Sequence, residues 1–210
     1  MHGERGEPGA AGLRPGLRQT DSGSMHAIDS VGQMDPLTFR RATTDDVSAL
    51  LVLVTSAYRG DASRQGWTCE ADLIDGQRLD ADVLRGDLSR ADSLVLLGER
   101  GGDLVGCAHI AKDVGDTAYF GMFAVRPTGQ SQGDGKRILA EAERLAVSEW
   151  DSTVMTMTVI DVRDSLIAFY ERRGYRRTGV QKPFDFDTRF GIPRRDDLRL
   201  EVLEKVLQHG

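Results

Sequence analysis

The sequence contains few cysteines and no long hydrophobic run. Its 210 residues include two cysteines, Cys69 and Cys107, whose separation matches no metal-ligand pattern. We interpret both as reduced thiols of a cytosolic protein and expect no bound metal. No apolar stretch is long enough to cross a bilayer, and the N-terminal residues contain no signal-peptide core. The sequence therefore predicts a cytoplasmic protein that has no membrane partner.

An excess of basic residues is also missing. Lys and Arg together number 27 against 33 Asp and Glu, which gives a net charge of −6. No basic cluster alternates with aromatic residues, so we do not expect nucleic acid as a partner. An acidic surface is compatible with a cationic substrate such as an amine.

Apolar periodicity is absent from the beginning of the chain. Residues 1–35 are rich in Gly, Pro, Ser and charged residues, and they cannot bury enough surface to offset the entropy lost on ordering. We predict a disordered N-terminal arm over 1–35 and a single globular domain over 36–208. Met25 or Met34 could be the true start of the protein, so no function is assigned to the arm.

The region 36–208 shows alternating strand and helix patterns. Residues 43–46 have the spacing of a helix capping box, and the helix that follows is expected to end at Gly60. Asp161 and Asp164 are expected to cap a later helix that ends at Gly174. The predicted strands are 37–42, 93–100, 103–114, 117–125, 153–160, 175–180 and 198–206, and a short helix is predicted over 81–88. This order predicts an α/β fold with a mixed sheet (an α+β arrangement) and helices on both faces.

A glycine-rich turn near the middle of the chain is its most informative feature. A strand-like run ends before Pro127, and an amphipathic helix follows the spacing Gln130-x-x-Gly133-x-Gly135. Glycines let the backbone approach a ligand, and the N–H groups of a first helical turn attract anions. The spacing matches neither a dinucleotide-binding fingerprint nor a P-loop. The turn therefore predicts a site for a phosphate-bearing ligand, with an ordinary strand-to-helix loop as the alternative.

A second motif lies about 35 residues further on, in the run Tyr170-Glu-Arg-Arg-Gly174-Tyr175. The glycine turn resembles the acyl-CoA pyrophosphate loop of the GCN5-related N-acetyltransferases (GNAT family), and the second run resembles the end of the family's late helix. The resemblance covers roughly residues 37–207. It implies a GNAT-like acyl-CoA N-acyltransferase fold, acetyl-CoA as cosubstrate, and transfer of the acetyl group to a primary amine by direct attack.

The resemblance also implies a cofactor site. The backbone of the strand over 121–125 would pair with the pantetheine arm and polarise the thioester carbonyl. The glycine turn over 130–136 would hold the pyrophosphate. Asp134 stands where the family usually has an apolar or basic residue, and we expect its carboxylate to face solvent. The implied cofactor-binding residues are Phe123, Ala124, Val125, Gln130, Ser131, Gln132, Gly133, Asp134, Gly135 and Lys136.

The resemblance also implies candidate catalytic residues. Tyr170 matches the family tyrosine that protonates the leaving thiolate, and core packing is its alternative role. Glu70 lies in the loop region that, in this family, forms the wall of the acceptor pocket. It is our candidate general base. Arg163 replaces a common asparagine and could contact a phosphate or cap a helix. The alternatives for the base are a water chain and the side chains of Asp72, Tyr58 and Asp116, whereas His109 is expected to be packed or hydrogen-bonded.

Several properties stay open at this point. The acceptor could be a small amine, an aminoglycoside, an amino acid or a protein N-terminus, because pocket loops vary freely on one scaffold. A rival function is an acyl-CoA-binding or sensing module that has lost catalysis. A different phosphate ligand is a third reading. We expect a bacterial enzyme with a small-molecule or peptide amine as partner, and a homodimer is compatible with the sequence.

Overall fold

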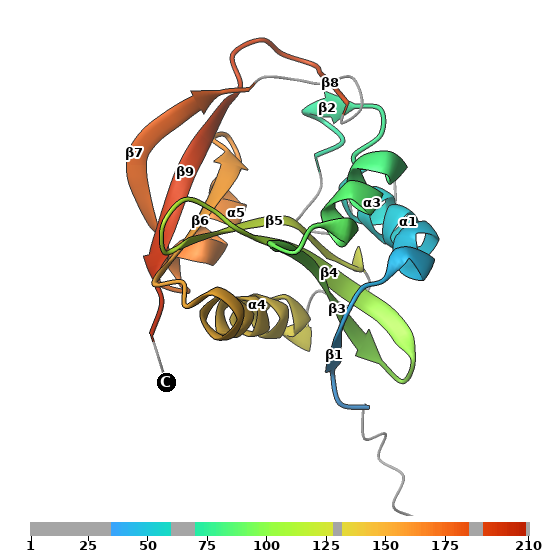
Figure 1. Ribbon diagram of the computed structural model, residues 1–210. Coiled ribbons are helices and arrows are strands. Elements are labelled where there is room, and N and C mark those ends of the chain that lie inside the picture. Colours follow the sequence, from blue (N-terminus) through green and yellow to red (C-terminus); the bar gives the residue numbers. More distant parts are fainter. Residues whose placement is uncertain (1–34, 60–69, 128–131, 185–190, 209–210) are drawn as a thin grey trace, which may run out of the picture. The chain divides into compact units, whose positions relative to one another are not determined.

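A computed structural model describes residues 35–59, 70–127, 132–184 and 191–208. Figure 1 shows the ribbon and labels its helices and strands. The predicted arm over 1–35 falls almost wholly outside the described residues, as does Gly60, so the proposed domain boundaries stay a prediction.

The core of the fold is a seven-stranded sheet with the order β1-β3-β4-β5-β6-β9-β7. Neighbouring strands run antiparallel except β5 and β6, which are parallel. The predicted mixed sheet is therefore confirmed. The strands are β1 (Thr38–Arg41), β3 (Ser93–Arg100), β4 (Asp103–Lys112), β5 (Thr117–Val125), β6 (Val154–Ile160), β7 (Arg176–Pro183) and β9 (Arg199–Val206).

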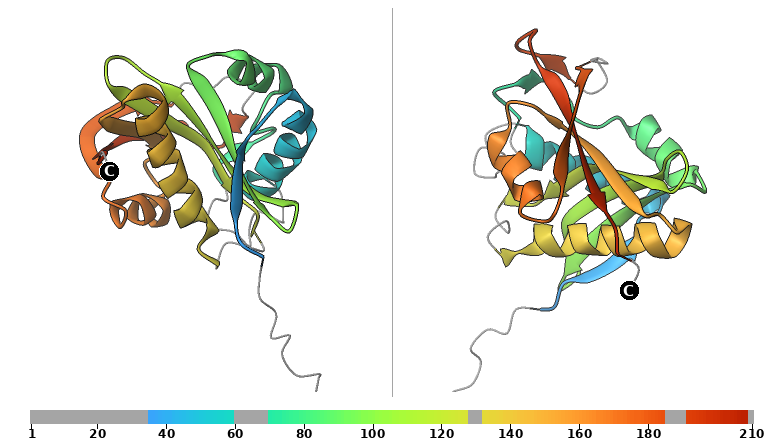
Figure 2. Two further views of the ribbon diagram at one scale, coloured as in Figure 1. Left: turned by 60° about the horizontal axis from the view of Figure 1, so that its bottom comes forward. Right: turned by 90° about the vertical axis from the view of Figure 1, so that its left-hand side faces the viewer.

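Helices cover both faces of the sheet, as predicted. One apolar cluster joins the sheet to α4 (Asp134–Trp150) and α5 (Asp164–Glu171). A second cluster joins the other face to α1 (Val47–Tyr58) and α3 (Ala81–Ser89). Figure 2 shows the two groups of helices on opposite sides of the strands. Among the described helices, α1 and α4 thus pack on opposite faces of the middle strands β4 and β5.

Two paired glycines let α4 approach the sheet closely. Gly98 on β3 lies opposite Gly106 on β4, and a Cβ on Gly106 would come within 2.5 Å of the Ile138 side chain. Ile138 is fully buried in this notch. Because a methyl group at Gly106 would meet the end of the Ile138 side chain and the Ala124 carbonyl, the glycine leaves the room in which Ile138 packs.

Local expectations were partly wrong around α5. The residue before the helix is Arg163, without a side-chain cap, and Asp164 is the first helical residue. Asp161 instead accepts a hydrogen bond from the Arg199 backbone N–H at 3.2 Å, so it ties β6 to β9. The capping box at Thr43 and Asp46 is present, and it precedes a short 3-10 turn (Thr44–Asp46) that leads into α1. A small second sheet, β2 (Ile74–Asp75) with β8 (Ile192–Pro193), was not predicted.

The sheet opens between its two parallel strands. Residues 117–119 of β5 pair with residues 154–156 of β6, and the pairing ends there. Beyond this point β6 continues to pair with β9 as far as Ile160, while β5 stays with β4. Figure 1 shows β6 turning away from β5. The two strands therefore separate at their C-terminal ends.

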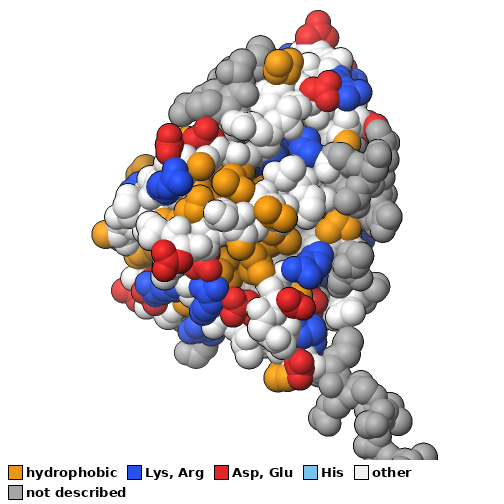
Figure 3. All heavy atoms as spheres, turned by 90° about the vertical axis from the view of Figure 1, so that its right-hand side faces the viewer, with side chains coloured by type: hydrophobic (Ala, Val, Ile, Leu, Met, Phe, Trp, Pro, Cys, Tyr) orange, Lys and Arg blue, Asp and Glu red, His pale blue; other side chains and the backbone are white. Residues whose placement is uncertain are grey.

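The face on which α1 and α3 lie carries hydrophobic side chains gathered in a patch, with acidic and basic side chains around it (Figure 3). Val52 of α1 is 71% exposed. Within the described ranges, no helix is both long and apolar enough to span a bilayer.

Candidate active site

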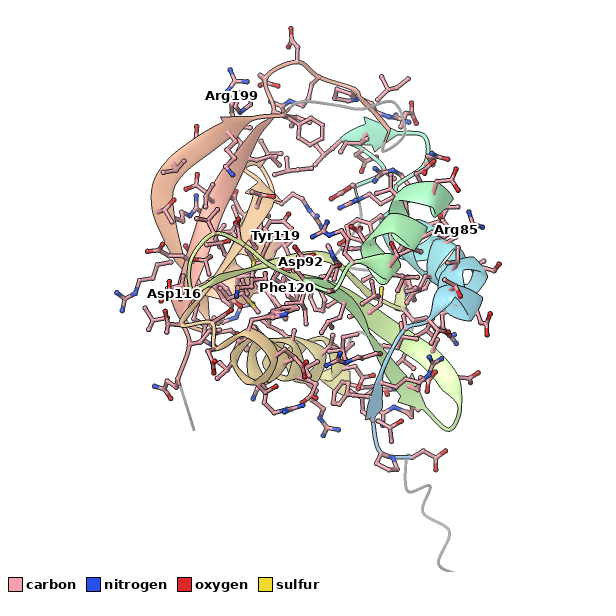
Figure 4. All side chains as sticks on the ribbon, in the orientation of Figure 1. Arg85, Asp92, Asp116, Tyr119, Phe120 and Arg199 are labelled. Carbon is pink, nitrogen blue, oxygen red and sulfur yellow. The ribbon has the colours of Figure 1, made fainter. Side chains whose placement is uncertain are left out.

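A cavity of about 350 Å³ occupies the opening between β5 and β6. Its walls come from both separated strands, the end of α1, the start of α5 and the loop around β2. Tyr119 and Phe120, labelled in Figure 4, both contribute to it from β5. Tyr119 also bridges to β6, because its hydroxyl lies 3.2 Å from the Thr158 hydroxyl. The volume suits a small molecule.

A β-bulge on β5 borders this cavity. Cys107 of β4 lies opposite Ala124 and His109 lies opposite Gly121, so three steps on β5 match two on β4. The extra residue falls at Met122, whose φ of 42° is in the left-handed region. A side chain other than glycine is strained there by about 1–3 kcal/mol, and such strain collects at functional sites. The bulge re-aims the β5 backbone at 121–123 toward the cavity.

The bulge also shifts which side chains face which helices. Before it, Ala118 and Phe120 pack in the cluster with α4, and after it Phe123 and Val125 do so. Ala124 packs on the opposite face with α1. The three strand residues that the sequence suggested for cofactor binding are all buried, and of these Phe123 lines the cavity.

Tyr58 fixes the bulge from the other side. Its hydroxyl donates a hydrogen bond to the Phe123 carbonyl, and burial raises the pKa of Tyr58 to about 12. The Cys107 thiol lies 3.7 Å from the Met122 carbonyl and is fully buried, which raises its pKa to about 12. A thiol with so high a pKa is a poor nucleophile, as expected for a structural cysteine.

Tyr170 lies in the wall of the same cavity. It is 4% exposed, and its ring packs edge-on against Phe120 and Tyr175. Burial, followed by the neighbouring Tyr58, raises the pKa of Tyr170 well above 10. The hydroxyl therefore stays protonated throughout the physiological range, and it is held by rigid aromatic packing.

Glu70 lies in the cavity wall too, within a cluster of arginines. Its Oε2 accepts from Arg59 at 2.9 Å and its Oε1 accepts from Arg163 at 2.8 Å. The Nε of Arg78 approaches Oε2 at 3.4 Å. Burial alone would raise the pKa of Glu70, but the charges of Arg78, Arg163 and Arg59 outweigh it and hold the pKa below its usual value. Such a carboxylate is a weak base.

The other candidates for the general base either form another hydrogen bond or lie outside the cavity wall. Tyr58 lines the cavity but has its hydroxyl on the Phe123 carbonyl. Asp116 lies at the beginning of β5 (Figure 4), accepts from the Thr153 hydroxyl, and is not a cavity residue. Asp72 is exposed and is not in the cavity wall either. His109 hydrogen-bonds Ser93 at 2.8 Å, as expected for a packed histidine.

The glycine turn is described only from Gln132 onward, and Gln130 and Ser131 lie outside the described residues. Gly133 is the N-cap of α4 with a φ of 78°, a conformation that glycine adopts without strain. Gln132 and Lys136 are exposed, whereas Gly135 is buried at the first turn. The described part of the turn, 132–136, does not line the cavity between β5 and β6.

The expectation that Asp134 faces solvent is wrong. Its side chain is 1% exposed and forms an ion pair with Arg100 of β3, which is 15% exposed. Because Arg100 neutralises it, the carboxylate does not present an unpaired charge to a ligand at the helix N-terminus. This pairing leaves no local pattern in the sequence, since 34 residues separate the two partners.

Several cavity residues could not be identified from the sequence. Arg59 follows an amphipathic helix, where a basic residue usually interacts with the helix C-terminus, and Arg78 lies in a loop without periodicity. Met122 reads as an ordinary strand residue, because a left-handed φ at a residue other than glycine leaves no sequence signal. Arg163 was noted only as a departure from the family pattern. Across the ranges that the structure covers, no group of His, Cys, Asp and Glu side chains could hold a metal ion.

Comparisons with known proteins agree with this geometry. A family model described as the acetyltransferase (GNAT) family matches residues 62–175. A search among curated proteins finds no match. Solved structures share the fold, at low sequence identity.

Three of these structures illustrate the similarity. The ribosomal-protein-S18-alanine N-acetyltransferase from Escherichia coli has a TM-score of 0.61 at 14% identity, over 83% of this chain and 96% of that one. The ribosomal-protein-alanine N-acetyltransferase from Brucella melitensis has a TM-score of 0.59 at 22% identity, over 81% and 99%. The IAA acetyltransferase from Bacillus cereus has a TM-score of 0.58 at 17% identity, over 82% and 100%. With the family model covering more than half of the sequence, and with the opened sheet, the chain belongs to the GNAT family of acetyltransferases.

Proposed function

We propose that this protein transfers the acetyl group of acetyl-CoA to a primary amine by direct attack, in the cavity between β5 and β6. The observation that carries the proposal is the separation of these two strands beside the bulge, because it leaves a small buried cavity with Tyr170 in its wall. A pantetheine arm would run along β5, and the first turn of α4 would take the pyrophosphate. Phe123 and the described turn 132–136 would provide these contacts.

In the proposed reaction, Tyr170 and the backbone at the bulge are the parts of the chain that act on the reacting atoms. The amine nitrogen attacks the thioester carbon, a C–N bond forms, the C–S bond breaks, and the nitrogen releases one proton to water as the amide forms. Tyr170 would donate its phenolic proton to the departing thiolate and then recover a proton from solvent. The backbone at the bulge would stabilise the oxyanion that develops on the carbonyl.

We do not assign the general base to Glu70. Its carboxylate is held by Arg59 and Arg163, and its lowered pKa disfavours taking a proton. We propose instead that the acceptor reacts as the free amine after losing its proton through water. Glu70 then serves as a positioning residue for the arginines.

An unpaired acidic residue in the pyrophosphate turn would support the rival function, a cofactor-sensing module without catalysis. Asp134 is neutralised by Arg100, so this support is lost. The aromatic wall around Tyr170 favours the enzyme.

The proposal predicts that the full chain binds CoA in preference to ATP. ATP shares the adenine and phosphates but lacks the pantetheine arm that β5 would hold, so we expect CoA to bind at least about tenfold more tightly, a difference of about 1.4 kcal/mol. Titration calorimetry with CoA, ATP and NAD measures this directly. Equal affinity for ATP and CoA would contradict the proposed cofactor.

A further inference from the structure

The cavity is basic, although the whole chain is acidic. The described side chains in its wall that carry charge are Arg59, Arg78, Arg163 and Glu70. Three positive charges and one negative charge give +2 (3 − 1) for this set. Charges away from water are stabilised by opposite charges, so a buried wall of this composition favours an anionic group on its occupant. The overall negative charge of the sequence had suggested only a cationic substrate.

Arg78 is the arginine that is open to such a group. Its side chain is 28% exposed, whereas those of Arg59 and Arg163 are 7% and 8% exposed. Both oxygens of Glu70 already accept closer bonds from these two arginines, and Arg78 approaches Glu70 only through Nε. Among the described residues, the terminal nitrogens of the Arg78 guanidinium have no hydrogen-bond partner, so they are available as donors at the cavity wall.

The Arg78 guanidinium is also held in place. Its central carbon lies 4.7 Å from the centre of the Tyr58 ring, in a cation–π contact. A planar guanidinium fixed on one face offers its edge to a carboxylate in a two-bond arrangement. Pre-organisation of this kind reduces the entropy lost on binding.

The same tyrosine places this donor near the reaction centre. The Tyr58 ring contacts Arg78, and its hydroxyl reaches the Phe123 carbonyl at the bulge. A small ligand that binds Arg78 through a carboxylate would therefore extend along the cavity wall past Tyr58, with its amine directed toward the bulge.

We infer that the acceptor is a small amine that also carries a carboxylate, in the manner of an amino acid, and that Arg78 binds the carboxylate. The inference rests on the proposed function and narrows it. Apolar side chains make up much of the remaining wall, which favours an acceptor with an apolar side chain; they include Ile74, Met157, Val159, Ile160, Phe184 and Leu200. The cavity volume of about 350 Å³ is sufficient for an acceptor of this size.

The test compares amino acids with the amines that lack only the carboxylate: L-phenylalanine with phenethylamine, L-leucine with 3-methylbutylamine, and L-methionine with 3-(methylthio)propylamine. Release of CoA from acetyl-CoA gives kcat/KM for each. For at least one pair we expect the amino acid to be preferred by about 10–100-fold, as a buried charge-assisted bond would give. Arg78→Gln should remove this preference, mainly through KM, and Arg78→Lys should restore part of it.

Arg85→Gln is the matched control, because Arg85 is 55% exposed on α3 and lies away from the cavity (Figure 4). It should leave the preference unchanged. A parallel titration of the CoA-saturated protein with N-acetyl-L-phenylalanine, N-acetyl-L-leucine and N-acetyl-L-methionine measures the carboxylate site without chemistry, and Arg78→Gln should weaken the binding of the preferred one about tenfold or more. Equal or faster turnover of all three decarboxylated amines would overturn the inference while leaving acetyl transfer intact. Absence of turnover with every acceptor, together with N-acetyl amino acid binding that depends on Arg78, would overturn the proposed function and support the carboxylate site.

Discussion

Replacing Tyr170 with phenylalanine should lower kcat by about 10²–10⁴-fold, the usual loss for a general acid. The fold and the affinity for acetyl-CoA should stay close to those of the original protein, because the ring keeps its packing against Phe120 and Tyr175. A thiolate is a fair leaving group, so a loss near the lower end of this range is expected. Steady-state kinetics with an accepted amine provide the measurement.

The pH dependence separates Tyr170 from the acceptor amine. Because the pKa of Tyr170 is raised well above 10, its hydroxyl keeps its proton across pH 6–10. Activity should therefore rise with pH as the amine loses its proton, with the same profile in both proteins. Tyr175→Phe is the matched control, since the buried Tyr175 hydroxyl contacts Met155 at 3.1 Å and is not a cavity residue. Near-full turnover by Tyr170→Phe would reduce Tyr170 to a packing role.

Replacing Glu70 with alanine should lower the free energy of unfolding by about 3–5 kcal/mol, because it leaves the buried guanidinium groups of Arg59 and Arg163 without their shared carboxylate. The thermal midpoint should fall by roughly 10 °C for a domain of this size. Glu70→Gln keeps a hydrogen-bond acceptor but loses the charge. Its free energy of unfolding should therefore lie between those of the original protein and Glu70→Ala. Thermal unfolding followed by circular dichroism measures both variants.

A general base at Glu70 would give a different pattern. In that case Glu70→Gln would fold with unchanged stability and lose about 10²–10⁴-fold in kcat. Because the pKa of Glu70 is lowered in the fold, its contribution to stability is complete above the usual carboxyl pKa and is lost as pH falls through the lowered value. The stability gap between the original protein and Glu70→Gln should therefore close in acid.

Glu171→Ala is the control for the stability measurement. Both partners of the Glu171 ion pair are more than 40% exposed, so this change should alter the free energy of unfolding by less than about 1 kcal/mol.

Much of the fold could be predicted because periodicity is a local signal. The strand runs at 93–100 and 117–125 agree with β3 and β5, and the amphipathic helix expected after the glycine turn agrees with α4, whose buried face includes Ile138. The two family motifs led to the GNAT fold because glycine spacing and a tyrosine near a helix end are readable in a short window.

The remaining features depend on partners that are distant in sequence. Glu70 and Arg163 are 93 residues apart and meet only because the sheet opens between β5 and β6. Asp134 is expected to face solvent, yet Arg100 at the end of β3 forms an ion pair with it. The basic character of the cavity arises in the same way, since Arg59, Arg78 and Arg163 come from three separate elements. Net charge averages over the whole surface and cannot reveal it.

Acetyl transfer itself is the most direct test of the central claim. The full chain is incubated with acetyl-CoA and a panel of amines with and without a carboxylate, and free thiol and N-acetylated product are both quantified. The account predicts that thiol and N-acetylated product form in equal amounts, only when an acceptor amine is present, and that Tyr170→Phe slows both together. Thiol release without N-acetylated product, or acetyl-CoA binding that no amine converts to turnover, would contradict it.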